Sequence, residues 1–283
     1  MRSSNPVLSR PDAWQVEPAN GQSAQYQGQP YQPGQPYPQG QPYPGQPGNG
    51  QAPYQGYQPP VQAGRMTIDD VISKSAITMG TLVAVAALSF VLLPQALLWP
   101  AAIIGALVSF GVVMLVSFRR NINPTFVLAY AAIEGVFIGA ISKIYETAWN
   151  GIVPAAVMGT LVAAGVTLAA YKFFNIKVTN KFRKMVMIGT IAYAGVLFLN
   201  FILSMFGINL MFGSGANIGM LLLFSAIGVG LAVFNLILDF DYIEQGVAMG
   251  ADASQSWRAA FGLTVTMVWL YIEILRLLSY FRR

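Results

Sequence analysis

The stretch Leu236–Gly246, LILDFDYIEQG, places three acids, Asp239, Asp241 and Glu244, at the end of a long apolar segment. The residues between these acids stay largely apolar, and the first residue suited to end a helix is the closing glycine. A helix that continues to Gln245 would hold Asp239 about 10 Å inside its end, at a rise of 1.5 Å per residue. Since carboxylates are costly to place in hydrocarbon, an acid at that depth indicates a functional site.

Another acid, Glu273, lies inside the last apolar segment, in WLYIEILRLL. We predict that Asp239 and Glu273 face each other. Two carboxylates within a few ångströms do not both ionise cheaply, so such a pair is expected to share a proton near neutral pH. When it is deprotonated the pair would attract cations, and carboxylate oxygen is a ligand type that suits calcium. Asp239 and Glu273 are therefore the predicted proton sensor and calcium ligands.

This pairing depends on where the last helix begins. Glu273 lies about 18 Å along a segment that starts at Phe261, which is deeper than the position expected for Asp239. The two depths match only if the segment begins later, for instance because residues 251–260 form a helical extension outside the membrane.

Two arginines at the end of the second apolar segment, Arg119 and Arg120, have two interpretations. Either they serve topology and lipid headgroup contact, or one of them pairs with Asp239 as a latch. Arg276 follows Glu273 by three residues, so a local ion pair on one helix face is the alternative for that acid.

Asp241, Arg276 and Glu134 are further candidates for an ion pathway. Glu134 lies in the middle of the third apolar segment and has no partner within reach on its own helix, because Lys143 is nine residues away. It could line the interior, or extend toward the membrane surface, which an acid does less well than a base.

The composition indicates an integral membrane protein. Of the 283 residues 55% are apolar and only 10% are charged, against about 25% charged in a water-soluble domain. The chain has no cysteine and no histidine, which excludes disulfides, imidazole bases and nearly all zinc, haem and iron–sulfur sites. We expect no cofactor and no enzymatic activity, and the net charge of +5 is read as a topology signal, not as a sign of nucleic-acid binding.

Seven apolar segments are each about the 20 residues needed to cross a bilayer. The predicted fold class is therefore an all-α membrane protein with seven transmembrane helices. The segments are 75–93, 99–118, 125–145, 152–171, 185–206, 217 to the acidic stretch, and 261–281.

Basic residues orient these segments. The connections at one end hold most of the bases, including five between residues 172 and 184, whereas loops 94–98, 146–151 and 207–216 hold none. The positive-inside rule then predicts a cytoplasmic N-terminus. Seven spans place the C-terminus outside, unless the last helix re-enters or stops short, which Arg282 and Arg283 would favour.

Residues 1–64 form a separate region rich in Pro, Gln, Gly and Tyr, with an imperfect QPYPGQPG repeat. It has too few aliphatic residues to form a core and is predicted to be a disordered cytoplasmic tail. A docking role toward a protein partner is the alternative. Residues 65–283 form the predicted transmembrane domain. Within it, Gly135 and Gly139 have the small-xxx-small spacing that lets helices pack closely in a bilayer.

Three motifs resemble the Bax inhibitor-1, or transmembrane Bax inhibitor motif, family in its bacterial, actinobacterial-type branch. They are AIEGVFIG at 132–139, DFDYI at 239–243 and LYIE at 270–273, and the resemblance extends over residues 68–283. It implies seven helices with the last one central and six around it.

The resemblance also implies a function. Bacterial members are pH-sensitive calcium leak channels with one sensing acid on helix six and another on helix seven, to which Asp239 and Glu273 correspond. The arginine that ends helix two corresponds to Arg119 or Arg120. This chain departs from the family pattern by having Glu in place of Asp at 273 and by a longer separation between the two acids.

The expected function is thus a pH-sensitive calcium or other cation leak channel of the bacterial cytoplasmic membrane, with the lipid bilayer and the ion as its partners. A proton-coupled secondary transporter would use the same acids. A non-catalytic regulator of a membrane protease or stress complex could use the N-terminal tail. An intramembrane aspartyl protease would also need two buried carboxylates, but no protease motif is present.

Overall fold

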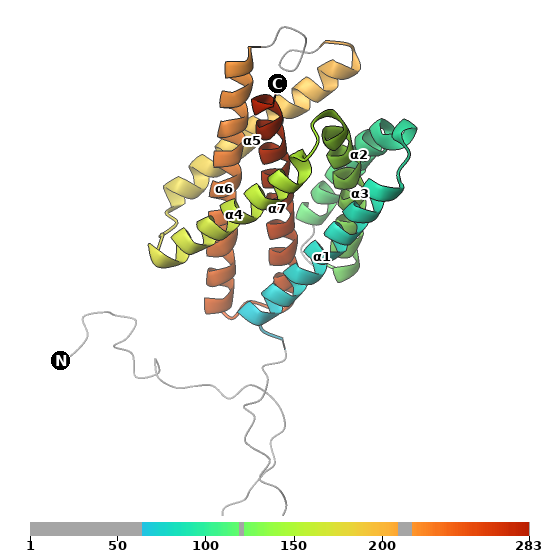
Figure 1. Ribbon diagram of the computed structural model, residues 1–283. Helices are drawn as coiled ribbons and strands as arrows, with labels where there is room; N and C mark the ends of the chain where they lie inside the picture. The colour runs from blue at the N-terminus through green and yellow to red at the C-terminus, as the bar shows by residue number, and fades with distance from the viewer. Residues whose placement is uncertain (1–63, 119–121, 209–216, 283) are drawn as a thin grey trace, which may run out of the picture. The chain divides into compact units, whose positions relative to one another are not determined.

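The computed structural model describes residues 64–118, 122–208 and 217–282, and this part of the chain contains seven long helices (Figure 1). Each is long and apolar enough to cross a membrane, which confirms the all-α, seven-helix fold. The N-terminal tail up to residue 63 and the proposed latch residues Arg119 and Arg120 lie outside the described residues. The helices are α1 (Ile68–Leu92), α2 (Leu98–Phe118), α3 (Pro124–Ala148), α4 (Ile152–Phe173), α5 (Asn180–Met205), α6 (Ile218–Ala248) and α7 (Ser254–Phe281), with the 3-10 turn η1 (Gln95–Leu97) before α2.

The outer surface of the bundle carries large apolar side chains. On α1, Val91 and Leu92 expose 72% and 73% of their surface, and similar residues cover the outward faces of α2, α4 and α5. Contiguous apolar surface of this extent is not stable in water. These faces therefore contact the hydrocarbon of a bilayer, and the chain is a multi-pass membrane protein.

Helix α7 occupies the centre of the bundle. It packs against α1, α3, α4 and α6, and more than half of its residues are buried. The prediction that the last helix is central is confirmed. In the described residues the backbone of α2 lies close only to α3 and η1, and the backbone of α5 only to α6. Side chains add two contacts, because Phe110 of α2 stacks on Phe198 of α5 and Tyr193 of α5 reaches Trp269 of α7.

The closest helix contact uses the two glycines of α3. A side chain at Gly135 would place its Cβ 2.7 Å from the carbonyl oxygen of Leu82, and one at Gly139 would place it 2.5 Å from that of Ala86. Both carbonyls belong to α1, so the absence of side chains lets the two backbones approach each other. This confirms the predicted packing role of the small-xxx-small pair.

The segment that enters α1 is attached to the turn between α6 and α7. Met66 N donates to the Ala251 carbonyl at 2.7 Å, and Ala253 N donates to the Gly64 carbonyl at 2.9 Å. Lys74 strengthens the attachment by donating to the Ala253 carbonyl at 3.1 Å. The start of α1 and the α6–α7 turn therefore lie at the same end of the bundle.

Helix α6 ends at Ala248, three residues later than expected. Gly246 was the predicted C-terminal glycine, but it remains helical and packs against Met66, whose sulfur would lie 2.8 Å from a Cβ at that position. Gly250 instead adopts the left-handed conformation, with φ of 63°, that ends the helix. The turn to α7 then takes only residues 249–253.

Helix α7 crosses the bundle completely. It is a continuous helix of 28 residues, about 42 Å long, so the alternative of a re-entrant or shortened last helix is wrong. Arg282 at its end donates to the carbonyl oxygen of Asn150 at 2.6 Å. Arg282 therefore has a hydrogen-bond partner at the end of the bundle where α3 is followed by α4.

Asp252, which precedes the N-cap residue Ala253, stabilises the turn that leads into α7. Its Oδ1 accepts a hydrogen bond from the backbone N–H of Ser254 at 2.8 Å, and this bond holds the pKa of the exposed carboxyl below its usual value. A lowered pKa in the folded state stabilises the fold above about pH 4, and the stabilisation is lost as the pH falls through the folded pKa. We expect Asp252→Ala to lower the melting temperature slightly at pH 7 and less at pH 3. A difference that is the same at both pH values would contradict this role, and Asp252→Asn, which keeps an acceptor, is the control.

Candidate functional site

Asp239 lies on the face of α6 that contacts α7. Its Oδ1 is 3.4 Å from the position of a Cβ at Gly262, and Thr266 of α7 lies beside the same carboxyl. Its Oδ2 is buried and has no hydrogen-bond partner. An ionised carboxylate in such a place is costly, so the group takes up a proton or holds a cation beside it.

Glu273 of α7 contacts α6 at a different height along the helix axis from Asp239. It is fully buried, and its carboxyl carbon would lie 2.7 Å from a Cβ at Gly228 of α6. Trp269 donates to its Oε1 at 3.2 Å, and Arg276 donates to both carboxylate oxygens at 3.2 Å. Because Gly228 has no side chain, this carboxylate can lie against the α6 backbone.

The predicted Asp239–Glu273 pair is wrong. Asp239 lies at the level of Gly262 and Thr266, whereas Glu273 lies at the level of Gly228, eleven residues before Asp239 on α6. The two carboxyls are therefore separated by about 16 Å along the contact between α6 and α7. The two acids cannot share a proton or a calcium ion in this arrangement.

The short turn is the physical reason for the separation. In two antiparallel helices joined by a tight turn, residues equally distant from the turn lie side by side. Asp239 is thirteen residues before Asp252, and Thr266 is fourteen after it. A helical extension over Ser254–Ala260 does exist, as the pairing required, but it remains packed in the bundle and leaves Glu273 too far along α7.

The alternative for Glu273, a local ion pair, is the arrangement found. Arg276 and Glu273 are both largely buried, with side chains 15% and 1% exposed. Three tyrosines lie near enough to the guanidinium to interact with it electrostatically, at the far end of the bundle from the α6–α7 turn: Tyr145 of α3, Tyr193 of α5 and Tyr280 of α7. Arg276 thus neutralises the acid on α7 and connects it to two other helices.

Asp241 and Glu244 form cross-links at the cytoplasmic end expected for α6. Asp241 accepts from Arg183 of α5 at 2.7 Å and from Gln245 at 2.8 Å. Glu244 accepts from the hydroxyl of Tyr171 on α4 at 2.6 Å. These acids connect α4, α5 and α6 at their ends, which gives Asp241 a structural partner that the sequence did not indicate.

Glu134 lies apart from the α6–α7 contact. It is 6% exposed and has Ser109 of α2 and Tyr130 of its own helix as neighbours. Tyr130 in turn makes an edge contact with Phe261 of α7 at 5.0 Å between ring centroids. Of the two alternatives for Glu134, the interior position is the one found, on the α2 side of the bundle.

In the described ranges no three acidic side chains converge to form a metal cage. The α6–α7 contact instead holds two separate acidic positions, which we call stations. At one, Glu273 is neutralised by Arg276, and at the other, Asp239 has an oxygen without a hydrogen-bond partner. Carboxylates spaced in this way suit an ion that moves past them better than one that is held permanently.

Sequence reasoning missed the residues that shape these stations. Gly228 lets the carboxylate of Glu273 lie against the backbone of α6, and Gly262 leaves room for the carboxylate of Asp239 beside α7. In the sequence, however, each was only one of many small residues in the spans. Tyr193 gave no signal of its own, because it lies on α5, two helices before Glu273 in sequence. The length of the α6–α7 turn was the signal that could have placed Gly262 and Thr266 opposite Asp239.

Comparison with known proteins agrees with this architecture. The family model described as Bax inhibitor 1 like matches residues 5–283, which is nearly the whole chain. A search of curated proteins finds no match. With seven membrane-spanning helices and a family model that covers almost every residue, this chain belongs to the Bax inhibitor 1 like family.

Proposed function

We propose that this protein is a pH-sensitive cation leak pathway, with calcium as the leading ion, in a bacterial cytoplasmic membrane. The observation that carries the proposal is the buried Oδ2 of Asp239, which has no partner although it lies in a membrane-spanning helix. A carboxyl of this kind responds to pH because it must gain a proton or a cation when it is enclosed.

In this mechanism Asp239 controls the entry of the ion. When it is deprotonated, its charge attracts a cation into the contact between α6 and α7, and when it is protonated that attraction is absent. Since Asp239 lies nine residues before the end of α6, the station is about 14 Å inside that helix end. Flux is therefore expected to be larger at pH 8 than at pH 6.

Glu273 and Arg276 form the second element of the mechanism. While the ion pair is closed, the acid on α7 is neutralised and its carboxylate blocks the approach to Gly228. Passage requires the arginine or the acid to move aside. The present arrangement, with the pair closed, corresponds to a closed state of the pathway.

The orientation of the chain is part of the proposal. Bases concentrate at one end of the bundle, where α1 begins, α4 is connected to α5 and α6 turns into α7. The positive-inside rule then places that end, and the N-terminus, in the cytoplasm. Asp239 would lie in the cytoplasmic half of the membrane and Glu273 in the outer half.

Calcium influx into liposomes that contain the purified full-length chain tests conduction itself. We expect influx that rises linearly with external calcium and that needs no counter-ion gradient. Saturating influx that depends on a proton gradient would instead identify a proton-coupled transporter. Absence of influx above that of empty liposomes would refute conduction and favour a non-catalytic regulatory role, for which the N-terminal tail is the candidate docking segment.

A further inference from the structure

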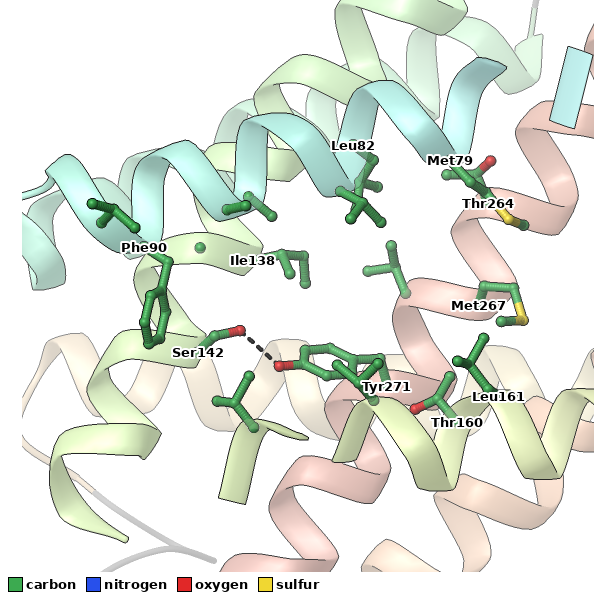
Figure 2. Close-up of a pocket in the computed structure, with 18 residues that line it drawn as sticks. Met79, Leu82, Phe90, Ile138, Ser142, Thr160, Leu161, Thr264, Met267 and Tyr271 are labelled. Atoms are coloured by element: carbon green, nitrogen blue, oxygen red, sulfur yellow. Dashed lines mark hydrogen bonds between the residues drawn. The ribbon is translucent and has the colours of Figure 1, made fainter. Parts of the chain in front are cut away.

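A cavity of about 530 Å³ lies between α1, α3, α4 and α7 and plays no part in the mechanism above (Figure 2). Its walls are almost entirely apolar, with Leu82 and Phe90 of α1 and Ile138 of α3 among the side chains that line it. Helices α1 and α4 flank it without packing against each other in the described part of the chain. The cavity therefore opens sideways between these two helices.

The opening faces the bilayer. Val83 and Val91 on the α1 side and Val157 and Leu161 on the α4 side line the cavity and are 63%, 72%, 42% and 57% exposed. They belong to the apolar outer surface that contacts hydrocarbon. The cavity is thus continuous with the lipid-facing surface, and hydrocarbon can enter it without crossing a polar layer.

The few polar groups in the cavity are already satisfied. The hydroxyls of Ser142 and Tyr271 bond to each other at 2.7 Å across the floor (Figure 2). Thr160 and Thr264 each donate to a carbonyl of their own helix, at 2.7 Å in both cases. Water needs two to four polar partners to occupy a buried site, so this cavity is suited to an apolar occupant.

The dimensions fit one leaflet of a membrane. The lining residues of α1 run from Met79, near its middle, to Val91, near its end, which is about 18 Å of helix. One leaflet contributes about half of the roughly 30 Å hydrocarbon thickness. The lining residues of α4 come from its first half, so the cavity extends from mid-membrane toward the surface at which α1 ends and α4 begins.

A positively charged side chain lies at the end of the cavity nearest the membrane surface. Lys143 of α3 donates to the carbonyls of Leu93 at 2.7 Å and Val91 at 3.4 Å, beside the lining residues Phe90 and Val91. In the described residues its ammonium forms no ion pair with a carboxylate. It therefore provides positive charge at the depth at which a lipid phosphate would lie.

From this geometry we propose that the cavity is a binding site for one acyl chain of a phospholipid, whose phosphate lies at Lys143. The chain enters between α1 and α4 from the leaflet at the C-terminal end of α1. Tyr271, on the floor, belongs to the central helix, so an occupied cavity supports α7 on the side opposite to the contact with α6. The proposal depends on insertion in a bilayer and is independent of ion conduction.

The test uses phosphatidylglycerol with a photoactivatable diazirine on one acyl chain, in liposomes that contain the full-length protein. Labelling is mapped by mass spectrometry of peptides. We expect labels on the α1 and α4 segments that border the cavity. Val157→Trp fills the opening and is expected to reduce this labelling about tenfold. A loss of this size corresponds to an acyl chain that no longer buries about two methylene groups in the cavity. The matched control is Met158→Trp, because Met158 is 61% exposed on the same helix and does not line the cavity.

A second pair of variants, on α1, keeps the proposal testable if Val157→Trp does not fold. Ala87→Trp on α1 is expected to reduce labelling as well, whereas Leu88→Trp, outside the lining, is not. Lys143→Gln keeps a donor for the Leu93 carbonyl but removes the charge, and should lower labelling by phosphatidylglycerol while Lys143→Arg restores it.

Two results would overturn the proposal. Equal labelling in Val157→Trp and Met158→Trp, with the Ala87 and Leu88 variants also equal, would mean that the lipid only covers the outer surface. A disulfide-linked dimer formed by Val157→Cys, in a chain that has no other cysteine, would identify a second copy as the occupant.

Discussion

Arg276→Met is expected to destabilise the protein by about 3–5 kcal/mol, because it leaves the Glu273 carboxylate buried without its cation. Glu273→Gln should cost a similar amount, since it leaves the buried guanidinium without its anion. The double variant Glu273→Gln, Arg276→Met should recover most of the loss, because replacing both charges of a buried pair removes the desolvation penalty together with the attraction.

Thermal unfolding of the four proteins in detergent measures this cycle. A strong coupling energy between the two positions is the expected result. Additive losses would show that the two side chains act independently, and the closed ion pair would then have no role. Asp70→Asn, which removes one charge of a partly exposed pair with Lys74 on α1 and leaves the bond from Lys74 to the Ala253 carbonyl, provides a comparison and should cost much less.

Gly139→Leu is expected to disrupt the contact between α1 and α3. Its Cβ would lie 2.5 Å from the Ala86 carbonyl oxygen and 2.6 Å from Ser89 Cβ, so the two helices must separate. Inserted bulk in a packed interior usually costs about 1–3 kcal/mol, and the contact with backbone places this variant at or above the upper end.

Gly165→Leu is the matched control for this prediction. Gly165 is exposed on α4, and a Cβ there meets nothing within 4 Å. The same substitution should be neutral or stabilising at this position, because leucine favours the helix over glycine by up to about 1 kcal/mol. Similar melting temperatures for the two variants would contradict the close packing of α1 on α3.

The fold could be predicted from the sequence because its signals are local. Each span is a run of about 20 apolar residues between turns, and a bilayer allows few alternatives to helices for such runs. The N-cap of α1 is a further local feature, since Thr67 Oγ1 accepts from Asp70 N at 3.2 Å. The glycine pair of α3 likewise identified its own packing face.

The site could be predicted only in part, because the distance between Asp239 and Glu273 depends on which residues of α6 lie opposite which residues of α7. That register depends on the turn, where Gly250 and not Gly246 ends α6. The burial of Glu273 and of the Oδ2 atom of Asp239 was expected from their apolar neighbours in sequence. Their partners were not, apart from Arg276, which lies three residues from Glu273 on one face of α7 and is therefore a local signal.

Calcium influx at pH 6 and pH 8 into liposomes that contain wild type, Asp239→Asn or Glu244→Gln tests the role of Asp239 most directly. Glu244 is an exposed acid on the same helix, so its variant controls for loss of charge alone. Wild type and Glu244→Gln should both conduct several-fold more at pH 8, whereas Asp239→Asn should conduct equally at both values. An Asp239→Asn protein that keeps the pH response of wild type would show that the proton sensor lies elsewhere.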